Sequence, residues 1–526
     1  MSRRPNVAIV GAGASGAVLA ARLTEDADRH VLLLDMGHMP HGEEGFGPAL
    51  LDARLVPGAQ PDHPATTAHS VRLTPERPWQ VMRGRVLGGS TTVNGGYFVR
   101  ARRADFHRWA AAGNPAWNYD AVLPFLRMLE TDLDFGPSEL HGDQGPMRIR
   151  RTRLEHPAAA AFRDAAQQLG FPADPDKNDQ APPGFGPVPS NAIDGVRRNA
   201  GLSYLPPEVL ARPNLITLSG WQARRVVVEG GRAVGVVAEH GGRRAVVEAD
   251  SVVLSAGALA TPHLLLLSGI GPRADLERVG IPVVCDAPAV GANFSDHPQV
   301  VLDWTPRGGL GEPTDSWLGG CLHLSSTGSK PDGAAAPGDL EILQSLVPMA
   351  GLVSGAVSVP GAPLSFLVSA LTPRPTGRLR IRSADPDTPP DIDYNYLGTA
   401  DDLCRLRAVV RVTAALLDTP PFAEISSGLR EPGKQVLDDD SALNQWIREN
   451  LGTTQHTCGT APMGPADDSR HSAVDQFGRV HGVRGLRVAD TSILPDAPQR
   501  GPAATAVLIG EFIADAIRRD LRLESI

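Results

Sequence analysis

The sequence predicts an α/β fold built around a parallel sheet, on the evidence of its first forty residues and of one later segment. An apolar run at 7–10 is followed by a glycine turn, an alanine- and leucine-rich segment with helical spacing, and a second apolar run at 31–34. This order is typical of parallel sheets, because parallel strands need a crossover connection. Residues 251–272 show the same order of strand, turn and helix, as a buried strand, a small-residue turn and a leucine-rich helix.

The length of the chain indicates two joined domains. A chain of 526 residues is too long for a single hydrophobic core of ordinary size. Its composition, 42% hydrophobic and 21% charged, is that of a soluble globular protein. The net charge of -9, without any basic block, argues against nucleic acid or an anionic membrane as the main partner.

The sequence also bears on location and on metal binding. The N-terminal apolar run leads into a glycine motif rather than a cleavage site, and no apolar stretch reaches the roughly 18 residues of a membrane span. The cysteines Cys285, Cys321, Cys404 and Cys458 lack CxxC or metal-ligand spacing, so we expect neither disulfides nor a metal site. A cytoplasmic location is expected, with peripheral attachment at the inner face of the membrane as an alternative.

The first forty residues have the spacing of a dinucleotide-binding unit. The motif "GAGASG" supplies Gly11, Gly13 and Gly16, and the second strand ends on Asp35. Gly11 would permit a tight turn, Gly13 would let a pyrophosphate reach the backbone, and Gly16 would allow close helix packing. The helix N-terminus would offer amide donors to phosphates, and Asp35 would accept hydrogen bonds from a ribose. This unit alone leaves NAD and FAD as alternatives.

Four further motifs resemble the glucose-methanol-choline (GMC) oxidoreductase family. They are "RGRVLGGSTTVNGGYF" at 83–98, "SVVLSAGALATPHLLLLSGIGP" at 251–272, "VGANFSDHP" at 290–298 and "VHGVRGLRVADTSILP" at 480–495. The resemblance covers nearly the whole chain and implies FAD as the cofactor. It also implies a discontinuous Rossmann-like FAD-binding domain and a substrate domain with an antiparallel sheet backed by helices.

The resemblance implies where the two domains lie. The FAD-binding domain is expected at 1–150, 190–300 and 450–526, and the substrate-binding domain at 151–189 and 301–449.

The composition changes within the expected substrate domain. Residues 305–337 are rich in Gly, Pro and Ser, which predicts loops or a mobile cover. Residues 355–371 and 377–383 alternate like strands, and 401–418 have helical spacing.

The resemblance further implies which residues contact FAD. In the family, the segment matched by Gly84 to Asn94 lies along the flavin, and the one beginning at Asp490 meets the pyrophosphate and ribityl region. Ala223 matches a residue whose backbone holds the adenine edge. Val93 stands where some members attach FAD through a histidine, so non-covalent FAD is expected. The expected contacts are Gly11, Gly13, Ala14, Ser15, Gly16, Asp35, Met36, Arg85, Gly88, Gly89, Asn94, Gly95, Ala223, Ala256, Gly257, Asp490, Thr491, Pro502 and Ala503.

His456, in "TTQHTCGTAPMG" at 453–464, is the candidate catalytic base. Oxidation of an alcohol by FAD requires a group that takes the hydroxyl proton, and a neutral imidazole is suited to that task. The resemblance matches His456 to the histidine that serves as base in the family. Of the other histidines, His141, His297, His471 and His481 are expected to be structural or solvated, and His263 to pack on its helix. Cys458 is expected to be a buried packing residue.

The sequence departs from the family at the second catalytic position. Most members carry a histidine or asparagine about ten residues before the glutamate matched by Glu511, and here Gly501 occupies that place. His456 would then act alone, with Gln455, a backbone amide or water holding the substrate oxygen. Arg500 is the alternative stabiliser of an alkoxide, although it could equally be a solvated surface charge. Gly501 would also make room for a bulky substrate.

A narrower resemblance concerns the substrate. "HGDQGPMRIRR" and "RVADTSILPDAPQRGPAATAVLIGE" resemble a bacterial branch associated with the redox peptide cofactor mycofactocin. This resemblance implies a dehydrogenase that reoxidises reduced mycofactocin and passes electrons towards the respiratory chain. The alternatives are a generic FAD alcohol oxidase using oxygen, a lyase that keeps FAD without redox chemistry, and a flavin-bound chaperone or binding protein.

Overall fold

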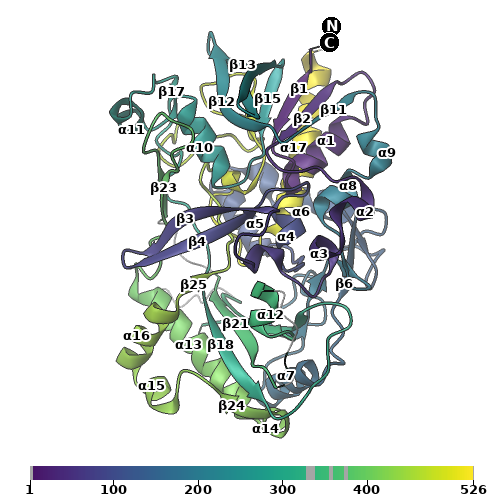
Figure 1. Cartoon of the computed structure of the whole chain (residues 1–526), viewed down its shortest axis with the longest axis vertical. Helices are drawn as coiled ribbons and strands as arrows, with labels where there is room; N and C mark the ends of the chain where they lie inside the picture. The colour runs from purple at the N-terminus through teal and green to yellow at the C-terminus, as the bar shows by residue number, and fades with distance from the viewer. Residues whose placement is uncertain (1–3, 327–337, 355–358, 360, 372–376, 525–526) are drawn as a thin grey trace.

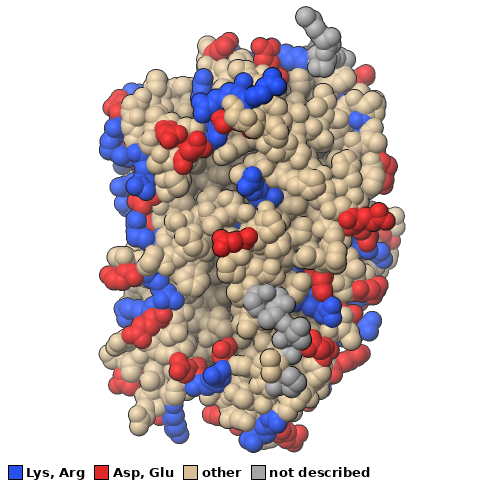
Figure 2. All heavy atoms as spheres, in the orientation of Figure 1, with Lys and Arg blue, Asp and Glu red and all other residues tan. Residues whose placement is uncertain are grey.

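The computed structural model describes residues 4–326, 338–354, 359, 361–371 and 377–524. Figure 1 shows an elongated molecule with a parallel sheet near one end of its long axis and an antiparallel sheet near the other. On the face drawn in Figure 2, acidic and basic side chains are interspersed and no patch of one sign dominates. Among the described helices, none combines the length and apolar character needed to cross a membrane.

The predicted parallel sheet is present and has five strands. In sheet order they are β11 (Leu215–Ser219), β2 (Val31–Asp35), β1 (Val7–Val10), β15 (Ser251–Leu254) and β26 (Leu486–Val488). All pairings are parallel, so the carboxyl ends of the strands share one edge. The first helix, α1 (Ala14–Leu23), is buried along nearly its whole length because it lies against the long C-terminal helix α17 (Ala503–Glu524) (Figure 1).

Two smaller sheets flank the parallel one. The segment after β11 forms a three-stranded antiparallel sheet, made of β12 (Gln222–Glu229), β13 (Arg232–His240) and β14 (Arg243–Glu248). A long hairpin, β3 (Thr66–Thr74) and β4 (Arg77–Gly84), joins β22 (Arg378–Arg380) and β23 (Asp391–Asp393) in a four-stranded sheet. This last sheet combines chain from the segments 1–150 and 301–449, so the two expected domains share it.

The antiparallel sheet at the other end is backed by helices, as expected for the substrate domain. Its strands are, in sheet order, β24 (Ser426–Leu429), β18 (Pro298–Pro306), β21 (Leu364–Ala370), β20 (Leu340–Ser345), β19 (Leu318–Leu324) and β7 (Phe185–Pro187), with β25 (Gly452–Thr453) also pairing with β18. The helices α7 (Pro157–Gln168), α13 (Ala400–Leu417) and α14 (Pro420–Ile425) pack against it. The buried side chains of β18, among them Val300, Leu302 and Trp304, alternate with less buried ones on the other face of the strand.

The remaining helices include the leucine-rich helix predicted within 251–272, and several of the others are short connectors. They are α2 (Gly42–Phe46), α3 (Pro48–Leu51), α4 (Ser90–Val93), α5 (Arg103–Ala111), α6 (Tyr119–Met128), α8 (Ala200–Tyr204), α9 (Pro207–Leu210), α10 (Ala260–Leu267), α11 (Arg273–Arg278), α12 (Met349–Ser354), α15 (Lys434–Asp438) and α16 (Asp440–Asn450).

The expectation of irregular chain at 305–337 is wrong in part. Strand β19 lies inside this range, and all seven of its residues are buried. The glycines of β19, which suggested a loop, are instead required for packing. A β-carbon on Gly320 would lie 2.5 Å from the ring of Phe185, and one on Gly319 would clash with Gln344. Residues 327–337 lie outside the described residues.

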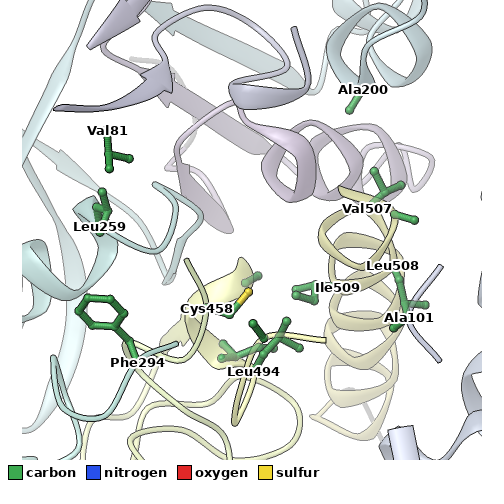
Figure 3. Close-up of a cluster of buried hydrophobic side chains, with 14 of the residues drawn as sticks. Val81, Ala101, Ala200, Leu259, Phe294, Cys458, Leu494, Val507, Leu508 and Ile509 are labelled. Atoms are coloured by element: carbon green, nitrogen blue, oxygen red, sulfur yellow. The ribbon is translucent and has the colours of Figure 1, made fainter. Parts of the chain in front are cut away.

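One hydrophobic core joins segments that are far apart in the sequence. Figure 3 shows Val81 of β4, Phe294 and Leu259 facing the turn that carries Cys458, with Ile509 of α17 alongside. Cys458 is fully buried there, as expected for a packing residue.

A buried ionic network holds the segment between α6 and β7. His141 sits between three carboxylates, with Nδ1 2.8 Å from Glu130 and 3.0 Å from Asp132, and Nε2 2.8 Å from Asp176. Arg100 contacts Glu130, and Arg151 contacts Asp132 and Asp176. Although burial opposes the charged form, hydrogen bonds to these carboxylates raise the pKa of His141 to about 10.

Replacing His141 with glutamine should therefore destabilise the fold in a pH-dependent way. The folded-state pKa of about 10 lies above the ordinary histidine value of 6.5, so the contribution of His141 is complete below pH 6.5 and disappears as the pH rises towards 10. Near pH 6.5 the loss should be about 3–5 kcal/mol, as for one member of a buried ion network. Thermal unfolding of both proteins across this range measures the difference, with His471→Gln on the surface as control. A wild-type advantage that stayed constant up to pH 10 would contradict the charged-imidazole account.

Candidate active site

Gly11 and Gly16 of the first turn have the structural roles that their spacing predicts. Gly11 has a φ of +104°, and a β-carbon there would clash with the backbone of Ser255 at the end of β15. A β-carbon on Gly16 would overlap the carbonyl oxygen of Gly11. Gly13 differs, because the nearest atom to its β-carbon would be 3.9 Å away. Gly11 and Gly16 thus allow close packing within the protein. The backbone at Gly13 is left open, so a ligand could approach it.

Asp35 ties the end of β2 to the glycine turn. Its two carboxylate oxygens accept hydrogen bonds from the backbone N–H of Ala12 at 2.7 Å and of Gly37 at 2.6 Å. Burial raises the pKa of Asp35, while these two hydrogen bonds oppose the rise. Each oxygen keeps a second lone pair, so acceptance from a ribose is compatible with this geometry. Exposed Arg85 lies beside it, with Nε 3.5 Å from the carbonyl of Met36.

Asp490 joins the ends of β15 and β26. Its Oδ2 accepts from the N–H of Gly257 at 2.9 Å and from the hydroxyl of Thr261 at 2.6 Å, and its Oδ1 accepts from Ser492. The carboxylate is thus occupied by protein donors, and a contact with a cofactor would come from backbone. Gly257 is open towards ligand space, since a β-carbon there would meet no atom within 4 Å.

The candidate cofactor residues meet along one edge. Gly11, Asp35, Ala256, Gly257, Asp490 and Thr491 follow the carboxyl ends of neighbouring parallel strands, and Ala14, Ser15, Pro502 and Ala503 lie at the starts of α1 and α17. Two helix N-termini at one edge of a parallel sheet suit a phosphate-containing dinucleotide. Ser15 donates its hydroxyl to the carbonyl of Ala506, so it also joins the two helices. Ala223 lies on β12, just beyond Trp221, whose N–H donates to the carbonyl of Asp35.

The segment around α4 continues this edge. Gly89 lies so close to Gly13 that a β-carbon on Gly89 would be 2.8 Å from the Cα atom of Gly13. The neighbouring Gly88 donates its backbone N–H to the carbonyl of Ala12. The Asn94 side chain accepts from the N–H of Gly96, which closes the turn after α4. The carbonyl of Gly95 accepts from the Trp317 indole, and a β-carbon on Gly95 would lie 2.6 Å from that ring, so this glycine is required for packing. Val93 is buried.

His456 lies on a turn that Asp296 organises. The Asp296 carboxylate is buried and accepts hydrogen bonds from the N–H of His456 at 2.9 Å and from the hydroxyl of Thr457 at 2.8 Å. Arg83 of β4 donates to the carbonyl of Gln455 and to the hydroxyl of Thr457, both at 2.8 Å. The turn is therefore held from both sides, and the half-buried His456 ring has a defined position.

His297 is in direct contact with His456. The two Nδ1 atoms are 3.0 Å apart, and the rings meet edge to face with an interplanar angle of 86°. Burial lowers the pKa of His297 to about 4. Burial, then His297, then Arg83 hold the pKa of His456 well below its usual value. From the sequence, His297 was expected to be structural or solvated. It is buried and contacts the candidate base. This contact follows from the proximity of two loops in space, which the sequence pattern does not reveal.

Gln455 and Arg500 are less suited to catalysis than the sequence predicted. Gln455 has a φ of +63°, and its side-chain oxygen accepts from the N–H of Met82 at 3.0 Å, so the side chain turns towards β4. Arg500 is 1% exposed, which rules out a solvated surface charge. Its guanidinium donates to the carbonyl of Gly338 at 3.0 Å and to that of Gln499.

Gly501 faces the Cε1–Nε2 edge of the His456 imidazole. A β-carbon there would lie 3.3 Å from Cε1 and 3.4 Å from Nε2 of the imidazole. The Nδ1 edge of the His456 imidazole is thus occupied by His297, and the Nε2 edge faces a residue without a side chain.

The fold and this site define a nucleotide-cofactor oxidoreductase, and comparison with known proteins gives the family. The GMC oxidoreductase family models match residues 8–299 and 373–510, so the chain belongs to the GMC oxidoreductase family and is an FAD-dependent oxidoreductase. It is similar to an uncharacterised GMC-type oxidoreductase in the thcA 5' region of Rhodococcus erythropolis, with 38% identity covering 96% of each chain. A 5-(hydroxymethyl)furfural oxidase from Methylovorus sp. is 34% identical over 97% of this chain and 98% of the relative. Pyridoxine 4-oxidase from Mesorbium loti shares the fold, with a TM-score of 0.89, 27% identity and coverage of 98% and 99%.

Alanine substitutions should separate the two kinds of glycine. Gly13→Ala adds a methyl group where the protein leaves space, so the apoprotein should melt like wild type but bind FAD at least about tenfold more weakly, a loss of roughly 1.4 kcal/mol. Gly16→Ala should instead destabilise the apoprotein by about 1–3 kcal/mol, through overlap with Gly11. Thermal unfolding and fluorescence titration with FAD measure both effects. Unchanged FAD affinity in Gly13→Ala would refute the assignment of this turn to the cofactor.

Proposed function

We propose that the protein oxidises an alcohol, with His456 as the base that accepts the hydroxyl proton. The observation that carries this proposal is the environment of the His456 ring, which has a histidine partner at Nδ1 and the open Gly501 at Nε2. The names of the relatives agree, since hydroxymethylfurfural and pyridoxine are both alcohols. When bound, FAD supplies the acceptor for the hydride that leaves the carbinol carbon.

The histidine pair determines which nitrogen of His456 can act as base. A hydrogen bond between two Nδ1 atoms needs one proton, carried by one of the two rings. For Nε2 of His456 to be free to accept a proton, its Nδ1 must carry the hydrogen and donate it to His297. His297 then keeps its own proton on Nε2. The role of His297 in this account is to select the tautomer in which the open edge of His456 is basic.

The base assignment is tested by His456→Ala. The variant should keep its yellow FAD, because the ring takes no part in the phosphate-binding edge. Reduction of the flavin by an alcohol under anaerobic conditions should slow by about 10²–10⁴, the usual contribution of a general base. Stopped-flow absorbance of the flavin measures the rate. Near-full reduction in this variant would remove His456 from the mechanism.

The acid limb of the pH profile tests the histidine pair. His456 must be neutral to accept a proton, and its lowered pKa keeps it neutral well below pH 6.5, so the reduction rate should stay level from neutral pH down past that value. His297→Asn removes a neighbouring group that lowers this pKa, and the acid limb should move upwards towards pH 6.5. Rates measured from pH 4 to 8 in both proteins decide this. A uniform loss of rate with no movement of the limb would indicate a merely structural His297.

The finer proposal is a dehydrogenase that reoxidises reduced mycofactocin and passes the electrons towards the respiratory chain. It is supported by the sequence resemblance and by Gly501, which leaves room beside the base for a large peptide-derived substrate. Two of the compared proteins are named oxidases, which makes oxygen the alternative acceptor. Anaerobic flavin bleaching by simple alcohols, aryl alcohols and reduced mycofactocin, followed by reoxidation with air or with a quinone, separates these alternatives. Bleaching by any of them excludes a lyase.

The open edge itself can be tested at position 501. Gly501→Ala brings a methyl group against Cε1 and Nε2 of His456 and should slow flavin reduction about ten- to hundredfold through misplacement of the substrate. Gly501→Asn restores an amide donor and should be faster than alanine with a small primary alcohol but equally slow with reduced mycofactocin. Gly308→Ala, at an exposed glycine with no atom near its β-carbon, is the control. Wild-type rates in Gly501→Ala would show that the substrate does not use this edge.

A further inference from the structure

Four side chains with metal-binding donor atoms meet beside strands β19 and β20 of the antiparallel sheet. Cys321 and His323 alternate on β19, and Glu341 is the direct cross-strand partner of His323 on β20. Tyr97 reaches them from the segment that follows α4. Cys321, His323 and Glu341 are buried, and the tyrosine is half-buried. We call these four residues the Cys-His-Glu-Tyr cluster.

The donor atoms of the cluster are arranged as a tetrahedron. The cysteine sulfur is 3.8 Å from Nε2 of His323, 3.9 Å from Oε2 of Glu341 and 3.7 Å from the tyrosine hydroxyl. The other three separations are 3.0 Å between His323 and Glu341, 3.3 Å between Glu341 and Tyr97, and 3.5 Å between Tyr97 and His323. Four atoms at these separations enclose a point about 2.2 Å from each, and zinc bonds in proteins are about 2.0–2.3 Å long.

The cluster holds a buried carboxyl group without a cation in contact. Within the described chain, no lysine or arginine nitrogen lies within 4.0 Å of Glu341, and its one ion-pair partner is His323. Burial lowers the pKa of His323 well below its usual value, so this imidazole is neutral. The other histidine-carboxylate group, around His141, differs because Arg100 and Arg151 already supply its positive charge.

His323 presents only one nitrogen to polar partners. Its Nε2 faces the cluster, and its Nδ1 is buried with no hydrogen-bond partner among the described groups. No acceptor elsewhere therefore determines where the ring carries its proton, and Nε2 is free to act as a ligand when the proton is on Nδ1.

We propose that the Cys-His-Glu-Tyr cluster binds one zinc ion in a closed, tetrahedral, structural site. Thiolate, imidazole and carboxylate are the ligands that zinc takes in proteins, and four protein ligands leave no open position for substrate.

Charge and proton balance are consistent with this site. Zinc binds cysteine as the thiolate and glutamate as the carboxylate. Binding of Zn²⁺ releases one proton from the thiol and one from the carboxyl group, and both go to solvent. The dication with one thiolate, one carboxylate, a neutral imidazole and a neutral phenol then has no net charge. Arg500 and Lys177, which lie near enough to lower the pKa of Glu341, would face no added positive charge.

The site would join two parts of the chain that surround the active centre. Tyr97 follows the α4 segment expected along the flavin, whereas the other three ligands stand on the antiparallel sheet. A zinc ion would cross-link these parts in addition to the core packing. This role is independent of the identity of the substrate and of the base.

The test uses the FAD-loaded enzyme, stripped with a chelator, incubated with Zn²⁺ or Co²⁺ and passed through gel filtration. We expect one zinc per chain by elemental analysis and a higher unfolding temperature than in the stripped protein. Co²⁺ should give tetrahedral d–d bands to the red of the flavin absorption. Cys321→Ser and Glu341→Gln should lose the metal and the thermal shift, and Tyr97→Phe should weaken retention.

Cys404→Ser, the same change at an exposed cysteine of α13, is the matched control and should keep wild-type zinc. Flavin content and visible spectrum show whether each variant is folded. If Cys321→Ser fails to fold, the Co²⁺ spectrum of the wild-type enzyme decides alone. Zinc far below one equivalent in the wild type, unchanged zinc in a folded Cys321→Ser, or Co²⁺ bands without thiolate and tetrahedral character would each overturn the proposal. The cluster would then be a hydrogen-bonded network with a protonated Glu341.

Discussion

The structure depends on the direct approach of backbone to backbone at the carboxyl edge of the parallel sheet. Gly11 lies against the backbone after β15, Gly16 against the carbonyl of Gly11, and Gly89 against Gly13. A side chain at Gly11, Gly16 or Gly89 would push the first turn, α1 and the α4 segment apart. Because these segments stay in contact, the N-termini of α1 and α17 lie along one edge, which an extended dinucleotide can follow.

Buried polar groups determine where the ring of His456 lies relative to this edge of the sheet. Asp296 accepts hydrogen bonds from the turn that carries His456, and Arg83 holds the same turn from β4. His297 occupies one edge of the imidazole, so the other edge is directed at Gly501. Position 501, where the sequence lacks the expected second histidine or asparagine, is therefore a space beside the candidate base, and no neighbouring side chain is recorded in its place. Arg500 is turned away to the carbonyl of Gly338, where it belongs to the electrostatic surroundings of the Cys-His-Glu-Tyr cluster.

The predictions that succeeded rest on local pattern. The βαβ unit, the distinct roles of Gly11 and Gly16, and the burial of Cys458 follow from spacing and residue type. The predictions that failed concern residues whose environment is built from distant chain. The glycine-rich stretch 305–337 was expected to be irregular, yet it contains β19, because Gly319 and Gly320 allow close packing against Gln344 and Phe185. Periodicity does not reveal such a requirement, since it depends on what lies across the sheet.

The sequence by itself determined the fold class and located the candidate cofactor residues and the candidate base, because each is encoded within a short segment. The tertiary structure alone decided which groups surround that base. Asp296 and His297 are about 160 positions from His456 in the chain, and Tyr97 is more than 220 from Cys321. The physical reason is that hydrogen bonds and metal coordination act over about 2–3 Å, whereas sequence patterns report only neighbours along the chain. Contacts that close a loop of such length leave no periodic signal in the residues that make them.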